Sequence, residues 1–178
     1  MTQAIAVIRK EHQNMTKLLD LLDRQIDLIE NAVQPDYDLI KEIVDYFLTF
    51  PDLYHHPKED LIFRKIKRRA PDLAADLFDL EAEHENVSDR LHAFTRTLVN
   101  VMLEAEISRD SFVATAREFI DGERQHMADE EKHFFRLALD TLVDEDWADI
   151  DAAIANFSDP LDDEPTLRFR SVEVYLKQ

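Results

Sequence analysis

The chain has 178 residues, no cysteine, a single glycine and a formal charge of −18, from 21 Lys and Arg against 39 Asp and Glu. The lack of thiols excludes disulfides, thiolate zinc sites, iron–sulfur clusters and cysteine nucleophiles. Because the acidic surface repels phosphates and anionic lipids, we expect no binding to nucleic acid or membrane. Nothing resembles a signal peptide or the ~20 apolar residues of a membrane span, so we expect a cytoplasmic protein.

Apolar residues recur every three or four positions over four long stretches, which predicts four helices that each bury one face. The stretches cover residues 2–32, 37–69, 72–104 and about 108–141. The scarcity of glycine and proline disfavours a turn-rich β architecture. We therefore predict an all-α protein with an up-down-up-down four-helix bundle over residues 1–142. Residues 143–178 are expected to form an extension, with a short helix over about 145–155 and a tail packed on the bundle.

Histidines and glutamates interrupt these apolar faces at positions that repeat between the two halves of the chain. Each half has a histidine on its first helix and a His-x-x-x-Glu sequence on its second. The repeated positions are His12, His55 and Glu59 in the first half and His84, His126 and Glu130 in the second. A lone buried histidine is usually a satisfied core residue. A repeated set is different, because buried imidazoles and carboxylates are costly unless they are paired or bound to metal.

The spacing predicts a site for two metal ions. Residues i and i+4 lie on one face of a helix, so His55 and Glu59 can reach one site together, as can His126 and Glu130. Two hairpins related by a pseudo-twofold axis would then supply four imidazoles as terminal ligands and two carboxylates as bridges. Each metal would keep open positions for an oxide or hydroxide and a small ligand. This donor set suits iron, although zinc or manganese could also occupy it.

The six residues match the pattern H…HxxxE…H…HxxxE, and over residues 4–140 the chain resembles the hemerythrin-like family of HHE cation-binding domains. The resemblance implies a four-helix bundle with two iron ions (Fe²⁺/Fe³⁺), bridged by oxide or hydroxide, that takes a small diatomic or peroxide ligand. Ser88 stands one turn after His84, where oxygen-carrying hemerythrins have a further histidine. The six-residue set is more similar to that of bacterial members linked to nitric-oxide stress and iron-centre repair.

Two functions remain open from the sequence. The first is a non-haem di-iron protein that binds or reacts with dioxygen, peroxide or nitric oxide. The second is an iron-handling or iron- and redox-sensing module that acts through a partner protein. A purely structural bundle is disfavoured by the repeat. A ferritin-type oxidase is disfavoured because its Glu-x-x-His signature has its best candidate in Glu123-x-x-His126, and the first half has Asp52 in place of that glutamate. No catalytic residue is assigned, and enzymatic turnover stays undecided.

Several further positions lie close in sequence to the expected metal ligands. Glu123 and Asp52 each precede a histidine by three residues, and Glu123 is either a carboxylate at the bundle edge or an acceptor for a ligand imidazole N–H. Gly122 and Pro51 each precede a histidine by four residues, and both disfavour a regular helix. The histidines outside the repeat are expected in solvent or beside the ligands: His56, His92 and His133.

If the distortion at Gly122 makes room for a small ligand, Gly122→Leu should slow the binding of azide or nitric oxide without emptying the metal site. Stopped-flow absorbance, together with elemental analysis of the variant, measures both properties. Unchanged ligand kinetics with full metal loading would instead favour the alternative, in which Gly122 only allows two helices to approach closely.

Overall fold

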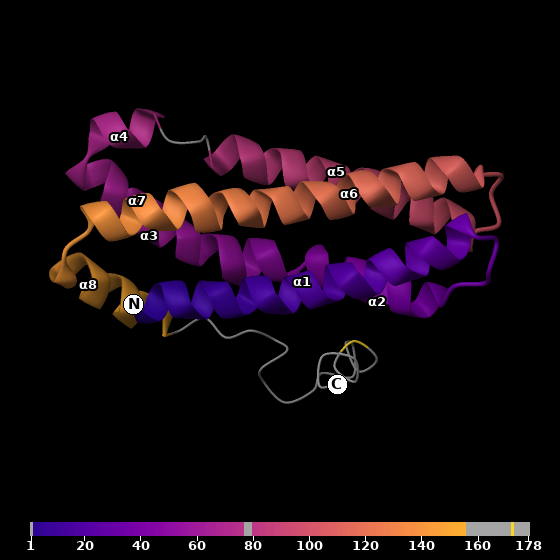
Figure 1. Cartoon of the computed structure of the whole chain (residues 1–178), viewed down its shortest axis with the longest axis horizontal. Helices are drawn as coiled ribbons and strands as arrows, with labels where there is room; N and C mark the ends of the chain where they lie inside the picture. Colours follow the sequence, from indigo (N-terminus) through magenta and orange to yellow (C-terminus); the bar gives the residue numbers. More distant parts are fainter. Residues whose placement is uncertain (1, 77–79, 156–171, 173–178) are drawn as a thin grey trace.

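The computed structural model describes residues 2–76, 80–155 and 172, and every regular element in these residues is helical (Figure 1). The elements are α1 (Gln3–Glu30), α2 (Tyr37–Phe47), η1 (Pro51–His55), α3 (His56–Arg69), α4 (Pro71–Asp76), α5 (Leu80–Met102), α6 (Arg109–Asp129), η2 (Glu130–Phe134), α7 (Phe135–Thr141) and α8 (Asp144–Ile154). The η elements are π-helical turns. The prediction of an all-α bundle is confirmed.

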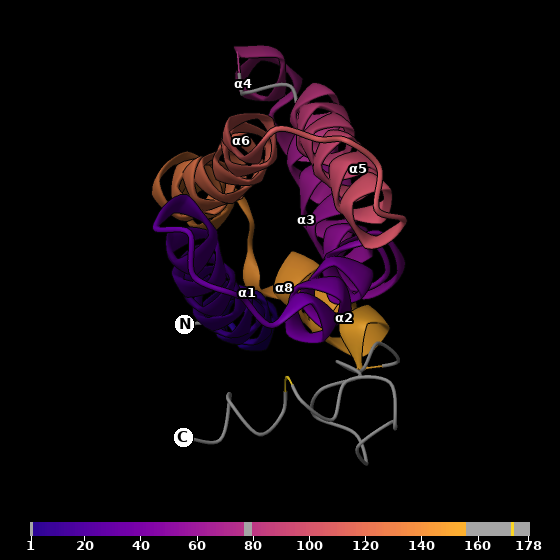
Figure 2. The same cartoon turned by 90° about the vertical axis from the view of Figure 1, so that its right-hand side faces the viewer.

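Four arms run along the long axis of the molecule (Figures 1 and 2). They consist of α1, of α2 with η1 and α3, of α5, and of α6 with η2 and α7. Helix α6 packs against both α1 and α5, whereas α8 covers one end of the bundle beside the start of α1. This helix matches the short one expected over 145–155. The tail expected over 157–178 lies outside the described residues, except for Val172.

One of the four expected helices is interrupted at a proline. The stretch 37–69 divides after Phe47, and the chain resumes with η1 at Pro51, because proline lacks the N–H that a regular helix needs. The stretch expected over 72–104 holds the short α4 and the longer α5, and residues 77–79 between them lie outside the described residues. Elsewhere the boundaries follow local capping. The side chains of Thr2, Asp36 and Ser108 each accept a hydrogen bond from a backbone N–H in the first turn of their helix.

The two π-helical turns lie in the two His-x-x-x-Glu arms, but at different places relative to the repeat. His55 is the last residue of η1, and Glu130 is the first residue of η2. Such turns insert an extra residue into a helix and often mark functional sites. Here both lie within the two His-x-x-x-Glu arms, at the level of the repeated polar residues.

Two apolar clusters fill the bundle on either side of this polar level. The larger includes Leu19, Phe94 and Phe119, and the smaller includes Ile8 and Trp147. On α1 the sequence passes from the smaller cluster through His12 into the larger one. The polar level is therefore closed at both ends by packed side chains. Val172 is fully buried in the larger cluster, and its backbone N–H donates to Glu42 on α2.

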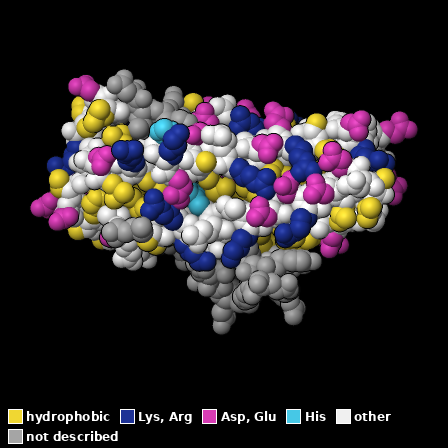
Figure 3. All heavy atoms as spheres, viewed as in Figure 1, with side chains coloured by type: hydrophobic (Ala, Val, Ile, Leu, Met, Phe, Trp, Pro, Cys, Tyr) yellow, Lys and Arg dark blue, Asp and Glu magenta, His cyan; other side chains and the backbone are white. Residues whose placement is uncertain are grey.

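Ion pairs connect α1 to α6 on the outer face of the bundle. Arg117 pairs with Asp27 at 2.5 Å and with Glu30 at 3.1 Å, and Arg124 pairs with Asp20 at 2.8 Å. Positive and negative side chains accordingly alternate across this face (Figure 3). Among the described helices, none combines the length and the apolar character that crossing a membrane would need.

Phe94→Ala should lower the free energy of unfolding by about 3–5 kcal/mol, the usual cost of removing a buried phenylalanine side chain. Phe94 is fully buried and stacks on Phe119, with ring centroids 6.0 Å apart. Urea denaturation of the metal-free protein measures the change. Val99→Ala on the same helix is the control and should change the value by no more than about 0.5 kcal/mol, since Val99 is exposed. Similar losses in both variants would contradict this assignment of the core.

Candidate metal centre

The structure brings all six repeated residues together at one level of the bundle. Each of the four arms contributes to the group. The residues come from α1 (His12), η1 (His55), α3 (Glu59), α5 (His84), α6 (His126) and η2 (Glu130). Five are buried, and the side chain of His84 is 15% exposed. Segments more than a hundred residues apart in the sequence thus meet at one site.

Glu59 lies between the histidines of the two halves. Its Oε1 is 3.3 Å from Nε2 of His55 and 3.8 Å from Nε2 of His12. Its Oε2 is 3.5 Å from Nε2 of His84. One carboxylate therefore presents one oxygen to the first-half histidines and the other oxygen to the second half.

Glu130 repeats this arrangement with the two halves exchanged. Its Oε2 is 3.3 Å from Nε2 of His12, and its Oε1 is 3.2 Å from Nε2 of His126 and 3.7 Å from Nε2 of His84. Together the two carboxylates define two positions. Each position is flanked by two imidazole nitrogens and by one oxygen of each glutamate.

The polar atoms at these positions lack ordinary partners. Both carboxylate oxygens of Glu59 and of Glu130 are buried without a hydrogen bond to any residue that the structure describes, as are Nε2 of His84 and Nε2 of His126. Leaving such atoms unpaired is costly in a protein interior. Ligand atoms of His12, His55, Glu59 and Glu130 all lie within 4.8 Å of one another. A cation bound among these nitrogens and oxygens would satisfy them, so the residues present fit a metal.

Two side chains that the sequence did not single out hold the ring of His55. Its Nδ1 lies 2.9 Å from Oε2 of Glu11, and the other oxygen of Glu11 accepts a hydrogen bond from the fully buried Lys58. A carboxylate on the outer nitrogen fixes the imidazole tautomer and directs Nε2 towards a metal position. The recurrence of Glu11-His12 as Glu83-His84 was the one available signal for Glu11, but it did not indicate the partner.

The ring of His12 is held in a similar way. Its Nδ1 is 3.3 Å from Oε1 of Glu131, whose second oxygen accepts a hydrogen bond of 2.8 Å from Arg9. His126 differs, since its Nδ1 is buried without a hydrogen-bond partner among the described residues. The two halves of the centre are therefore supported differently.

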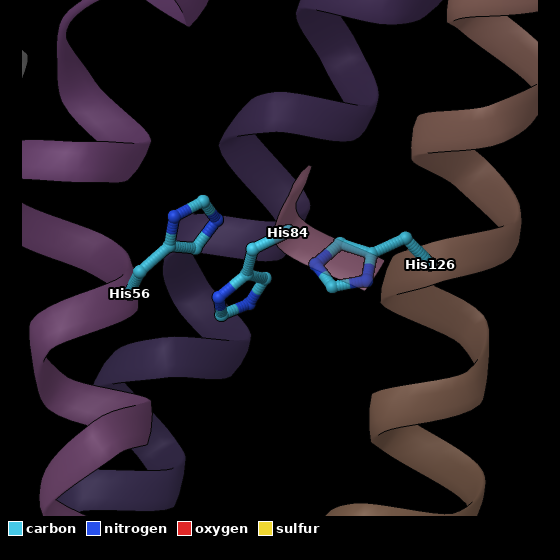
Figure 4. Close-up of side chains that lie close together, drawn as sticks. All are labelled: His56, His84 and His126. Atoms are coloured by element: carbon cyan, nitrogen blue, oxygen red, sulfur yellow. The ribbon is translucent and has the colours of Figure 1, made fainter. Parts of the chain in front are cut away.

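His56 lies beside the proposed ligand His84, which is one of the two places expected for it. Its ring stacks on that of His84, with centroids 3.7 Å apart and planes at 16° (Figure 4). Its Nδ1 is 3.3 Å from Asp52, a largely exposed carboxylate. Ligand atoms of His56, His84 and His126 lie within 4.8 Å of one another. Asp52 thus contacts His56 rather than the neighbouring His55.

The two remaining sequence candidates lie on α6. Glu123 is buried, and its Oε2 has no hydrogen-bond partner in the part of the chain that the structure describes. Gly122 lies beneath a side chain of α5, because a Cβ added there would be 2.7 Å from Nη1 of Arg90. This contact is with the end of a flexible side chain rather than with a helix backbone, so it favours neither of the two alternatives for Gly122.

The histidines and glutamates of the site shift one another's pKa values. Burial lowers the pKa of His55, but the charge of Glu59 and the contact with Glu11 outweigh it and raise that pKa to about 9. At His84, Glu130 and Glu59 likewise overcome burial and raise the pKa to about 10. In turn, the histidines hold the pKa of Glu59 well below its usual range despite its burial. Without metal, protons on the imidazoles therefore balance the carboxylates.

An all-α bundle with a buried cluster of histidines and glutamates defines a metal-binding helical protein. A scan against family models matches residues 3–138 to the hemerythrin HHE cation binding domain. The chain belongs to this family. Searches of curated proteins and of solved structures gave no match.

Metal affinity should rise with pH. Because the pKa values of His55 and His84 are about 9 and about 10, both imidazoles carry protons at neutral pH in the metal-free protein and must release them to bind a cation. Competition with a chromophoric chelator for Zn²⁺, at about pH 6 and about pH 8.5, should give the tighter apparent binding at the higher pH. Calorimetry in two buffers of different ionisation enthalpy should detect proton release. A pH-independent affinity would contradict this charge balance.

Proposed function

We propose that the chain is a non-haem di-iron protein that binds or reacts with a small oxidant: dioxygen, peroxide or nitric oxide. His12 and His55 would hold one iron ion, and His84 and His126 would hold the other. Glu59 and Glu130 would bridge the pair, with an oxide or hydroxide as the further bridge. The observation that carries the proposal is that each carboxylate presents one oxygen to each pair of histidines.

The number of donors favours a reactive centre over a purely structural one. Two imidazole nitrogens and two carboxylate oxygens give each iron four protein bonds. Iron commonly takes six, so positions remain for the bridging oxide or hydroxide and for an exogenous ligand. When bound, an iron pair of this kind supplies reversible electron transfer to a small oxidant.

The protein's own side chains would prepare the site for this chemistry. Glu11 and Glu131 hold the outer nitrogens of His55 and His12, which leaves both Nε2 atoms aimed inward. Lys58 and Arg9 fix these two carboxylates in turn. The apolar clusters on either side exclude bulk water and thereby strengthen the interaction of the buried carboxylates with a cation.

The purified protein, loaded with Fe²⁺ without air, should contain two iron ions per chain. After exposure to air it should show a near-ultraviolet or visible charge-transfer band that changes on addition of azide or nitric oxide. Glu59→Ala should lose at least one iron, because it removes an oxygen from both metal positions. Elemental analysis and an optical spectrum provide these measurements.

His133→Ala is the matched control, because it removes an exposed histidine of η2 that lies outside the six. It should leave both the iron content and the spectrum unchanged. A colourless wild-type protein that takes up no iron under these conditions would rule out the proposed function.

A further inference from the structure

A cavity of about 110 Å³ adjoins His84, the second-half histidine of α5. It lies between the end of α2, η1, α5 and α6. Its polar lining includes His56, His84, Ser88 and Glu123, and its apolar lining includes Leu91 and Phe119. The volume exceeds severalfold the ~10–15 Å³ that a single water needs on the same measure. There is therefore room beside His84 for a molecule of a few non-hydrogen atoms.

A buried polar atom of the cavity lacks a partner. Glu123 is 3% exposed and lines the cavity, and its Oε2 accepts no hydrogen bond from any described residue. A buried carboxylate oxygen without a donor is costly. A ligand, alone or through a water, would supply that donor. The residue His84 also lines the cavity, while its Nε2 lies 3.5 Å from Oε2 of Glu59 at the proposed metal position.

The first-half histidines are enclosed instead. The ring of His12 stacks on Phe135, with centroids 5.7 Å apart, and the ring of His55 lies 6.1 Å from that of Phe50. An open groove between α1 and α6 does border His12. In this groove, Glu131 contacts Nδ1 of His12, whereas Nε2 of the same ring faces Glu130. The groove therefore borders the edge of the His12 ring that points away from the proposed metal positions.

We propose that the exogenous ligand binds in the cavity beside His84 and reaches the metal pair from the side of His84 and His126. The ligand is a small molecule of two to about four non-hydrogen atoms, the size that the cavity admits. Glu123 orients it by accepting a hydrogen bond from a hydroperoxide, or from a bridging water that in turn donates to a ligand without hydrogen, and His56 keeps the His84 ring in place by stacking on it (Figure 4). This inference rests on the proposed function, and it assigns the ligand to one side of an otherwise symmetric centre.

Ser88→Leu tests the location, because Ser88 lines the cavity one turn after His84 and is not itself a proposed ligand. The larger side chain should occupy the space and weaken azide binding to the iron-loaded protein at least about tenfold, which corresponds to about 1.4 kcal/mol. Optical titration gives the azide affinity, and elemental analysis should still find two iron ions per chain. Ser88→Val is a milder filling variant to use if Ser88→Leu does not fold.

Ala128→Leu is the matched control, since it also adds a larger apolar side chain, in the groove bordering His12. It should keep the wild-type azide affinity within about twofold. Unchanged affinity in the folded Ser88 variants would overturn the location while leaving the di-iron proposal intact. A loss confined to Ala128→Leu would place the ligand on the opposite side. A wild-type protein that loads two irons but binds neither azide nor nitric oxide would overturn the location together with the small-ligand function.

Discussion

The structure depends on two carboxylates, Glu59 and Glu130, that face one another inside an apolar bundle. Two buried negative charges at one level repel each other and lose their hydration, which costs several kcal/mol per ion unless positive charge compensates them. Four histidines surround the pair, and they can neutralise it either by holding protons or by binding metal. The raised pKa values of His55 and His84 correspond to the first state, in which the imidazoles hold protons. The buried oxygens and nitrogens that lack a hydrogen bond among the described residues are the atoms that a bound cation would satisfy in the second state.

The remainder of the bundle supplies the stability that such a polar level requires. Apolar clusters lie on both sides of it, and the paired charges of Arg117 and Arg124 connect α1 to α6. The π-helical turn η1 ends at His55 and η2 begins at Glu130, so both turns lie at this polar level. Metal binding is thus coupled to folding, because four arms must pack before the donors converge.

The repeat in the sequence is symmetric, but its surroundings are not. On the side of His55 and His12, the buried Lys58 donates a hydrogen bond to Glu11, which contacts His55. Arg9 donates to Glu131, which contacts His12. The position equivalent to Lys58 in the second half is Asp129, which cannot donate such a hydrogen bond. His84 instead has a stacked imidazole and a cavity beside it. The centre therefore has one enclosed side, at His12 and His55, and one side that adjoins a cavity, at His84.

The sequence by itself determined the all-α class and the six polar positions, because helical periodicity and the His-x-x-x-Glu spacing are local properties of the chain. It also indicated a distortion at Pro51. Only the tertiary structure decided that Lys58 fixes Glu11, that His56 stacks on His84 and that Arg90 covers Gly122. These contacts join residues from different arms. Their formation depends on how the arms pack and rotate against one another, which a single-helix pattern does not specify.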